Sequence, residues 1–257
     1  MLLPLALPLA GCGVSKPRVV YPERLVSPYA FASGQAVWAV APPKNESGVS
    51  EVDELLIGDA LVEEIGQVKG LDALPLNRTL SAMRALGMAS VDSPAQAQTL
   101  AKALQADGIV VSSVTSWHPY QPPRLGLNVA LFGGPPPSQN AADGFTNGVR
   151  DLQSAASPKE GPGFSPANGP SVVSLVLDAS NTAIMRRVQL YGEARVESND
   201  PMGWERYSKS MKLYTRFACH RALELLLESE SSRLTPATPP PPGGEMAQIA
   251  DQAEQAR

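Results

Sequence analysis

Residues 93–117 read SPAQAQTLAKALQADGIVVSSVTSW, and they carry the clearest local structural signal in the chain. Ser93 followed by Pro94 is typical of a helix start, because serine caps free backbone N–H groups and proline fits the first helical position. Apolar residues then recur every three or four positions until Gly108, and residues 109–117 have the β-branched composition of a strand. The stretch predicts a helix that leads directly into a strand.

The preceding sequence repeats this alternation of strand and helix. Residues 35–41 are almost continuously apolar and end at two prolines, which predicts a buried strand. A capping pattern at Ser50 and Asp53 predicts a helix with one apolar face. A short strand over residues 71–76 and a helix capped by Asn77 follow. The acidic residues around the first helix are expected to face solvent, or alternatively to form a docking surface: Glu51, Asp53, Glu54, Asp59, Glu63 and Glu64.

The following sequence predicts more strands and one long helix. Residues 125–132 alternate large and small side chains and are expected to form a hairpin with the strand before them. Residues 171–178 and 183–197 are expected to form a second hairpin, with Arg186 and Arg187 on its solvent side. A helix is expected over residues 202–231, where apolar residues recur at helical spacing.

These elements predict an α/β fold with a single mixed-sheet domain over residues 35–232. Their order is strand, helix, strand, helix, helix, strand, strand, hairpin, helix. Residues 133–170 are rich in proline, glycine, serine and asparagine and are expected to be a disordered insertion. A proline-rich disordered tail is expected over residues 233–257.

Composition argues against two classes of partner and structure. The formal charge of −4 and the scattered Lys and Arg residues give no basic surface, so nucleic acid is not expected as a partner. The longest apolar run covers residues 1–10 and contains two prolines, which is too short for a membrane-spanning helix.

The first residues instead resemble a bacterial lipoprotein signal. Residues 1–11 read MLLPLALPLAG and have the length of a signal-peptide apolar region. Leu9-Ala10-Gly11-Cys12 resembles the lipobox, in which the cysteine is acylated before cleavage in front of it. This predicts palmitate or a similar acyl group on Cys12, and an outer-membrane anchor that faces the periplasm. The alternative is a short buried strand with a chance cysteine, and the lack of Lys and Arg before Cys12 leaves open a start farther upstream. Residues 12–34 are expected to be the lipidated N-terminus and a tether.

Three segments resemble one group of bacterial envelope lipoproteins. They are AVWAVAPPKNESG (residues 36–48), GDALVEEI (residues 58–65) and ALQADGIVVSSVTSW (residues 103–117). They are similar to lipoproteins related to the curli secretion component and the penicillin-binding-protein activators, whose fold resembles the N-terminal domain of the Tol-system periplasmic protein. In this sequence Ser112 or Ser113 stands where that group usually has glycine. The resemblance implies an α/β domain that binds another envelope protein or assembles with copies of itself.

Few residues are suited to catalysis or metal binding. His118 and His220 are the two histidines, and Cys219 adjoins His220 on a predicted helix, where neighbouring side chains point in different directions. Cys219 is therefore interpreted as a core residue. We expect no metal, no cofactor and no enzymatic activity.

A partner surface is instead suggested by an aromatic cluster and by a polar turn. Trp117, His118 and Tyr120 lie where a strand ends, and aromatic residues of this kind are common in binding hot spots. Asn45 and Ser47 could hold an anion at a helix start. The alternatives are that the aromatic residues only cover the end of the sheet and that the polar pair only satisfies its own turn.

Three functions are considered, of which the first is favoured and the last is the least expected. The first is a lipid-anchored, non-enzymatic adaptor that binds another envelope protein. The second is a subunit of an oligomeric export pore, which needs strands with an unbroken lipid-facing apolar row. The third is an enzyme with an unrecognised site.

Overall fold

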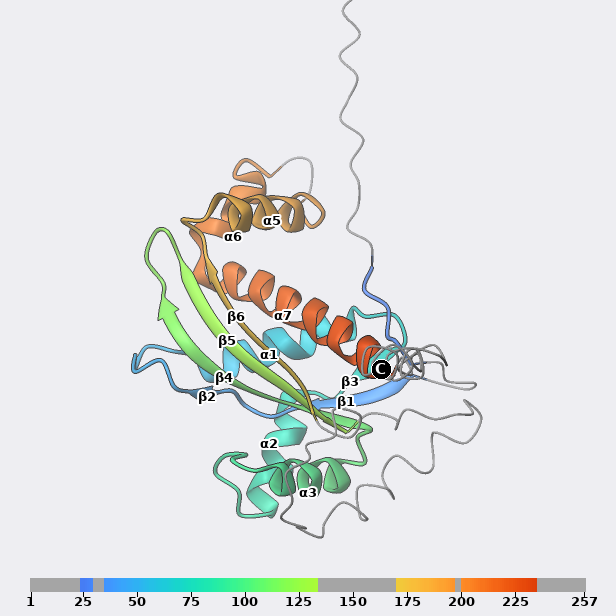
Figure 1. Ribbon diagram of the computed structural model, residues 1–257. Helices are drawn as coiled ribbons and strands as arrows, with labels where there is room; N and C mark the ends of the chain where they lie inside the picture. The colour runs from blue at the N-terminus through green and yellow to red at the C-terminus, as the bar shows by residue number, and fades with distance from the viewer. Residues whose placement is uncertain (1–23, 30–34, 134–169, 197–199, 235–257) are drawn as a thin grey trace, which may run out of the picture.

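One mixed β-sheet forms the centre of the molecule (Figure 1). The computed structural model describes residues 24–29, 35–133, 170–196 and 200–234. The strand order is β3-β1-β4-β5-β6, with β2 paired to β4. Pairing is parallel among β1, β2, β3 and β4, and antiparallel from β4 through β5 to β6. The strands are β1 (Ala36–Val40), β2 (Lys44–Asn45), β3 (Leu71–Ala73), β4 (Gly108–His118), β5 (Arg124–Gly133) and β6 (Ser171–Asp178). The predicted single mixed-sheet α/β domain is confirmed, as is the hairpin of β4 and β5.

Helices pack on both faces of this sheet. Helices α1 (Glu54–Gly66) and α7 (Met211–Leu234) cover one face, and α2 (Leu76–Ala85) and α3 (Pro94–Leu104) cover part of the other. The larger core lies beneath α1 and α7, where Trp38, Ile57 and Leu127 are fully buried. The smaller core joins Ala39 and Ile109 to α2 and α3. Alternating strand residues therefore face two different layers.

Local capping explains where α3 begins, as the sequence predicts. Ser93 is the N-cap, its hydroxyl accepts a hydrogen bond from the backbone N–H of Gln96, and Pro94 occupies the first turn. The capping expectations for α1 and α2 need correction. Asp53 rather than Ser50 caps α1, because its carboxylate accepts a bond from Leu56 N–H. Helix α2 begins at Leu76 after Pro75, so Asn77 lies inside it.

The second predicted hairpin is wrong in its second strand. Residues 183–193 belong to α5 (Thr182–Glu193), which follows β6 after a short turn. Asn181 is the reason: its side chain accepts a hydrogen bond from Ala183 N–H and caps a helix instead of closing a hairpin. Helical spacing then places Val188 and Tyr191 on one buried face. Arg186 and Arg187 are exposed, but on a helix.

The predicted last helix is divided into several parts. A short 3-10 turn (Gly203–Glu205) and α6 (Arg206–Lys209) precede α7, and the extended Ser210 separates α6 from α7. Helix α7 continues to Leu234, two residues beyond the expected domain end. No helix in the described part of the chain is long and apolar enough to cross a membrane.

Residues 24–29 pack against the domain, although they fall in the segment expected to be a tether. Val26 forms a parallel bridge with Lys69, and Ser27 N–H donates to the Lys69 carbonyl at 2.9 Å. The Tyr29 hydroxyl donates to Glu230 of α7 at 2.8 Å. The predicted signal peptide, Cys12, the rest of the tether, nearly all of the insertion and the tail beyond Leu234 lie outside the described residues.

Candidate protein-binding groove

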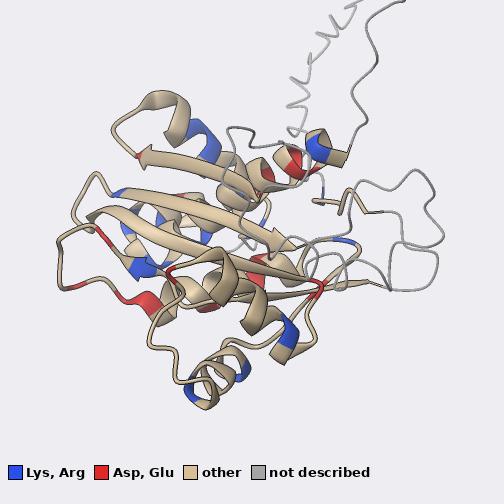
Figure 2. Cartoon of the chain, turned by 60° about the horizontal axis from the view of Figure 1, so that its bottom comes forward, with Lys and Arg blue, Asp and Glu red and all other residues tan. Residues whose placement is uncertain are grey.

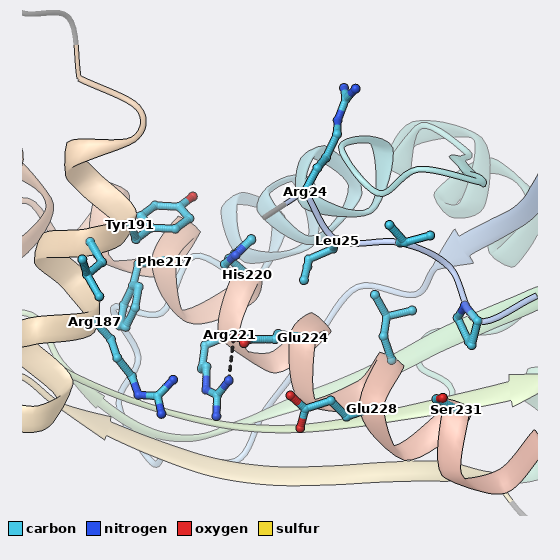
Figure 3. A pocket seen from close by; sticks show the side chains of 14 residues that line it. Arg24, Leu25, Arg187, Tyr191, Phe217, His220, Arg221, Glu224, Glu228 and Ser231 are labelled. Carbon is cyan, nitrogen blue, oxygen red and sulfur yellow. Dashed lines mark ion pairs between the residues drawn. The ribbon is translucent and has the colours of Figure 1, made fainter. Parts of the chain in front are cut away.

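A groove of about 580 Å³ lies between residues 24–28, α5 and α7 (Figure 3). The N-terminal segment forms one wall and α5 the other, with α7 between them. Apolar side chains from all three segments line it: Leu25, Val26, Leu190, Phe217 and Leu227. Val26 and Leu190 are 60% and 47% exposed, which is high for large apolar residues. The groove is a partly apolar surface open to solvent.

Charged side chains surround this apolar lining. Arg221 and Glu224 pair across one turn of α7 at 2.6 Å. Arg24, Arg187 and Glu228 have no ion-pair partner among the described residues. Elsewhere, charges of both signs are spread over many elements (Figure 2). The groove thus combines apolar contact area with charges that are available to a partner.

Two groove residues are fixed by a buried carboxylate behind them. The Glu64 side chain, on α1, is fully buried. One of its oxygens accepts a 2.7 Å hydrogen bond from the Tyr191 hydroxyl, and the other lies 2.9 Å from Nδ1 of His220. Arg195 lies 3.5 Å from the same carboxylate and stacks over the Tyr191 ring at 3.8 Å. Glu64 therefore joins α1, α5 and α7 beneath the groove.

The electrostatics of this cluster favour a fixed, ionised carboxylate. Burial opposes the ionisation of Glu64, but the hydrogen bonds from His220 and Tyr191 and the nearby Arg195 hold its pKa below the usual range. Burial and the charge of Glu64 raise the pKa of Tyr191, so its hydroxyl remains a donor. The arrangement suits a structural support, since the Tyr191 hydroxyl and one ring nitrogen of His220 are engaged with Glu64. Within the described ranges, no group of three or more His, Cys, Asp or Glu residues is placed to hold a metal ion.

The predicted aromatic cluster is only partly assembled, and it does not line the groove. Trp117 pairs with Leu125 across the β4–β5 hairpin and packs against the core. His118 and Tyr120 stack edge to face with ring centroids 5.7 Å apart. Tyr120 is 68% exposed. The exposed part of the predicted surface is therefore the His118–Tyr120 pair.

Asn45 is the last residue of β2, and Ser47 lies in the turn that follows it. The Asn45 side-chain oxygen accepts bonds from both the backbone N–H and the hydroxyl of Ser47, at 3.1 and 2.7 Å. Its amide nitrogen donates to the Val49 carbonyl at 2.7 Å. The two side chains are thus engaged in local turn contacts, as the alternative interpretation states.

Cys219 and His220 point into different surroundings. Cys219 is completely buried, its Sγ lies 3.9 Å from the Ile57 carbonyl, and burial raises the pKa of its thiol. His220 is only partly buried and lies against Glu64 and the groove. The interpretation of Cys219 as a core residue is confirmed.

The groove is not predicted from the sequence, and the position of Glu64, which supports it, differs from the prediction. The sequence predicts that Glu64 faces solvent or contributes to a docking surface, but Glu64 is buried because α7 packs along α1 and Tyr191 of α5 reaches its carboxylate. One local signal was available: Ile57, Leu61 and Glu64 are spaced by four and three residues, which places Glu64 on the apolar face.

Comparison with known proteins gives likenesses among solved structures but none at the level of sequence. No family model matches the sequence, and no curated protein matches it. Among solved structures, the chain is similar to the LpoB C-terminal domain from Salmonella enterica, with 15% identity and a TM-score of 0.32 over 40% of this chain and 75% of that one. It is similar to the hypothetical protein CT253 from Chlamydia trachomatis, with 11% identity and a TM-score of 0.39 over 79% of this chain and 100% of that one. It is also similar to lipoprotein GNA1162 from Neisseria meningitidis, with 14% identity and a TM-score of 0.34 over 57% and 84% of the two chains. At TM-scores this low, these likenesses establish neither a family nor a function.

Proposed function

We propose that this chain is a lipid-anchored protein of the bacterial cell envelope that binds another envelope protein without catalysing a reaction. The observation that carries the proposal is the groove, which combines exposed apolar residues with charges that have no ion-pair partner in the described part of the chain. The lipobox-like sequence Leu9-Ala10-Gly11-Cys12 supplies the anchor.

The position of the groove relative to Cys12 suits a membrane-proximal adaptor. Arg24, Leu25 and Val26 form one wall of the groove, and residues 13–23 connect this wall to Cys12. A connection of this length spans at most about 40 Å when fully extended. An acylated Cys12 would therefore keep the groove close to the membrane surface, where a partner in the same membrane can reach it.

The lining of the groove favours a particular kind of partner segment. Leu190 and Phe217 offer contact area to apolar side chains, while Arg24 and Arg187 offer positive charges that no described acidic residue pairs with. We infer that the partner presents an amphipathic segment whose apolar residues are flanked by Asp or Glu opposite Arg24 and Arg187 and by Lys or Arg opposite Glu228. In this proposal Tyr191 and His220 shape the wall, because Glu64 holds both of them in place.

Site-specific photo-crosslinking in the native envelope tests this proposal. A photoreactive amino acid replaces Leu190 in the full chain, and a matched chain carries it at Tyr120, which is more exposed but lies outside the groove. The proposal predicts a discrete crosslinked partner from position 190 that is weakened by Arg187→Glu and is absent from position 120. Crosslinking from position 120 alone, or crosslinking from position 190 that is insensitive to Arg187→Glu, would contradict it.

A further inference from the structure

Strand β6 is an open edge of the sheet in the described part of the chain. It pairs with β5 along its whole length, in a regular register from Ser171 to Asp178, and no described strand pairs with its other side. Figure 1 shows β6 at the end of the row of strands. One side of its backbone therefore presents N–H and C=O groups that can accept another strand.

This edge lacks the features that usually prevent strand addition. Its sequence, SVVSLVLD, contains no Lys, Arg or Pro, and its pairing with β5 shows no bulge. The one charged residue, Asp178, lies at the strand end and pairs with Arg124 at 2.7 Å. A long, regular edge whose one charge lies at its end is normally covered in natural proteins.

The outward residues of β6 form a self-complementary pattern. Val172 and Val176 are 57% and 58% exposed, and Ser174 lies midway between them on the same face. Leu175 and Leu177 point the other way, toward the core beneath α7. The pattern of outward residues reads the same from either end, so a two-fold axis through Ser174 places like residues opposite each other and makes the contact self-complementary.

We propose that β6 pairs antiparallel with β6 of a second copy of this chain, with Ser174 on the two-fold axis. This register places Val172 of each copy opposite Val176 of the other and keeps the apolar face of both strands on the same side. If the two-fold axis moved by one residue from Ser174, each exposed valine would lie opposite a serine or opposite residues at the strand ends. The contacts between Val172 of one copy and Val176 of the other would then not form. The two sheets become continuous, and the two grooves stay open because β6 contributes no residue to them. The inference is thus independent of the proposed function.

A disulfide at the symmetry axis tests the pairing in the full chain. Cα atoms of directly opposed antiparallel residues lie about 4.5–5.5 Å apart, within the range that a disulfide spans. After mild oxidation, Ser174→Cys should convert most of the chain to a covalent dimer on a non-reducing gel. Ser81→Cys, at an exposed serine on α2, and the parent chain provide the background. Dimer no stronger from Ser174→Cys than from Ser81→Cys overturns the proposal.

A charge-exchange series then tests the register. In the Ser174→Cys background, Val172→Lys with Val176→Lys places like charges opposite each other, whereas Val172→Lys with Val176→Glu places opposite charges together. The like-charged chain should lose about tenfold in dimer formation, and the oppositely charged chain should recover it. Equal dimer formation by the two chains overturns the register. Circular dichroism of each variant confirms that the fold is retained, since both positions face solvent.

Discussion

The hydroxyl of Tyr191 lies 2.7 Å from a carboxylate oxygen of Glu64, although the two residues are 127 positions apart in the chain. This contact joins α5, which forms a wall of the groove, to α1 in the body of the domain. His220 on α7 approaches the other carboxylate oxygen at 2.9 Å. Three helices thus meet at one buried carboxylate, and the shape of the groove depends on it.

Removal of the Glu64 charge should destabilise the domain strongly. Glu64→Gln leaves the partly buried Arg195 and His220 without their carboxylate partner, which is expected to cost about 3 kcal/mol of unfolding free energy. Glu63→Gln is the matched control, because Glu63 is half exposed and its ion pair with Arg216 should contribute about 0.5 kcal/mol. Urea unfolding of both variants measures the difference. Equal effects would show that the buried cluster does not support the fold.

The same carboxylate predicts a dependence of stability on pH. The pKa of Glu64 is lowered in the folded protein, so its stabilising contribution is complete above the usual value of 4.5. The contribution is lost as the pH falls below 4.5 toward the lower folded pKa. The stability gap between the parent chain and Glu64→Gln should therefore be full at neutral pH and should narrow in acid. A gap that is constant or widens in acid would be inconsistent with a lowered pKa.

Removal of two buried tyrosine hydroxyls should have different effects on the stability of the domain. The Tyr214 hydroxyl is buried and has no hydrogen-bond partner among the described residues, so Tyr214→Phe should leave stability unchanged or raise it by up to about 1 kcal/mol. Tyr191→Phe should cost about 2 kcal/mol, because Glu64 loses a buried donor. Thermal unfolding of the two variants provides the comparison. A larger loss from Tyr214→Phe would mean that its hydroxyl is bonded.

The hairpin of β4 and β5 requires glycine at one position. A Cβ at residue 126 would lie 2.5 Å from Thr115 Oγ1 and 3.0 Å from the Ser116 backbone nitrogen, beside the irregular register of β4. Gly126→Ala should therefore destabilise the domain by about 2 kcal/mol. Gly66→Ala at the end of α1 meets no atom within 4 Å and should stabilise by about 0.5 kcal/mol. Chemical denaturation of both variants checks the predicted opposite signs.

The parts of the fold that could be predicted depend on local chemistry. Ser93 and Pro94 specify the start of α3 by their own side chains, and the prediction there is confirmed. The sequence predicts a hairpin turn before Thr182, but Asn181 can either occupy a hairpin turn or cap a helix. The mixed pattern of the twelve residues that follow does not distinguish a strand from a helix. Packing of Val188 and Tyr191 into the core settles that choice, and this tertiary contact is not visible in the local sequence.

The groove could not be predicted because its parts are distant in sequence. Val26, Leu190 and Phe217 come from three separate segments that are brought together only by the tertiary fold. Glu64 resembles an exposed helix residue by its type; its spacing from Leu61 places it on the apolar face, but its partners on α5 and α7 are not evident from the sequence. The aromatic residues within 117–120 are close together in the sequence, and for that reason the sequence suggests them as a binding surface. They lie outside the groove, which closeness in sequence could not indicate.

Acylation of Cys12 is the claim on which the proposed function depends most directly. Incorporation of radiolabelled palmitate into the full chain, compared with Cys12→Ala, measures it. We predict a labelled chain that sediments with membranes, and an unlabelled Cys12→Ala chain that does not reach its mature form. A parent chain that stays unlabelled, retains its first residues and is recovered with soluble cytosolic proteins would contradict the account.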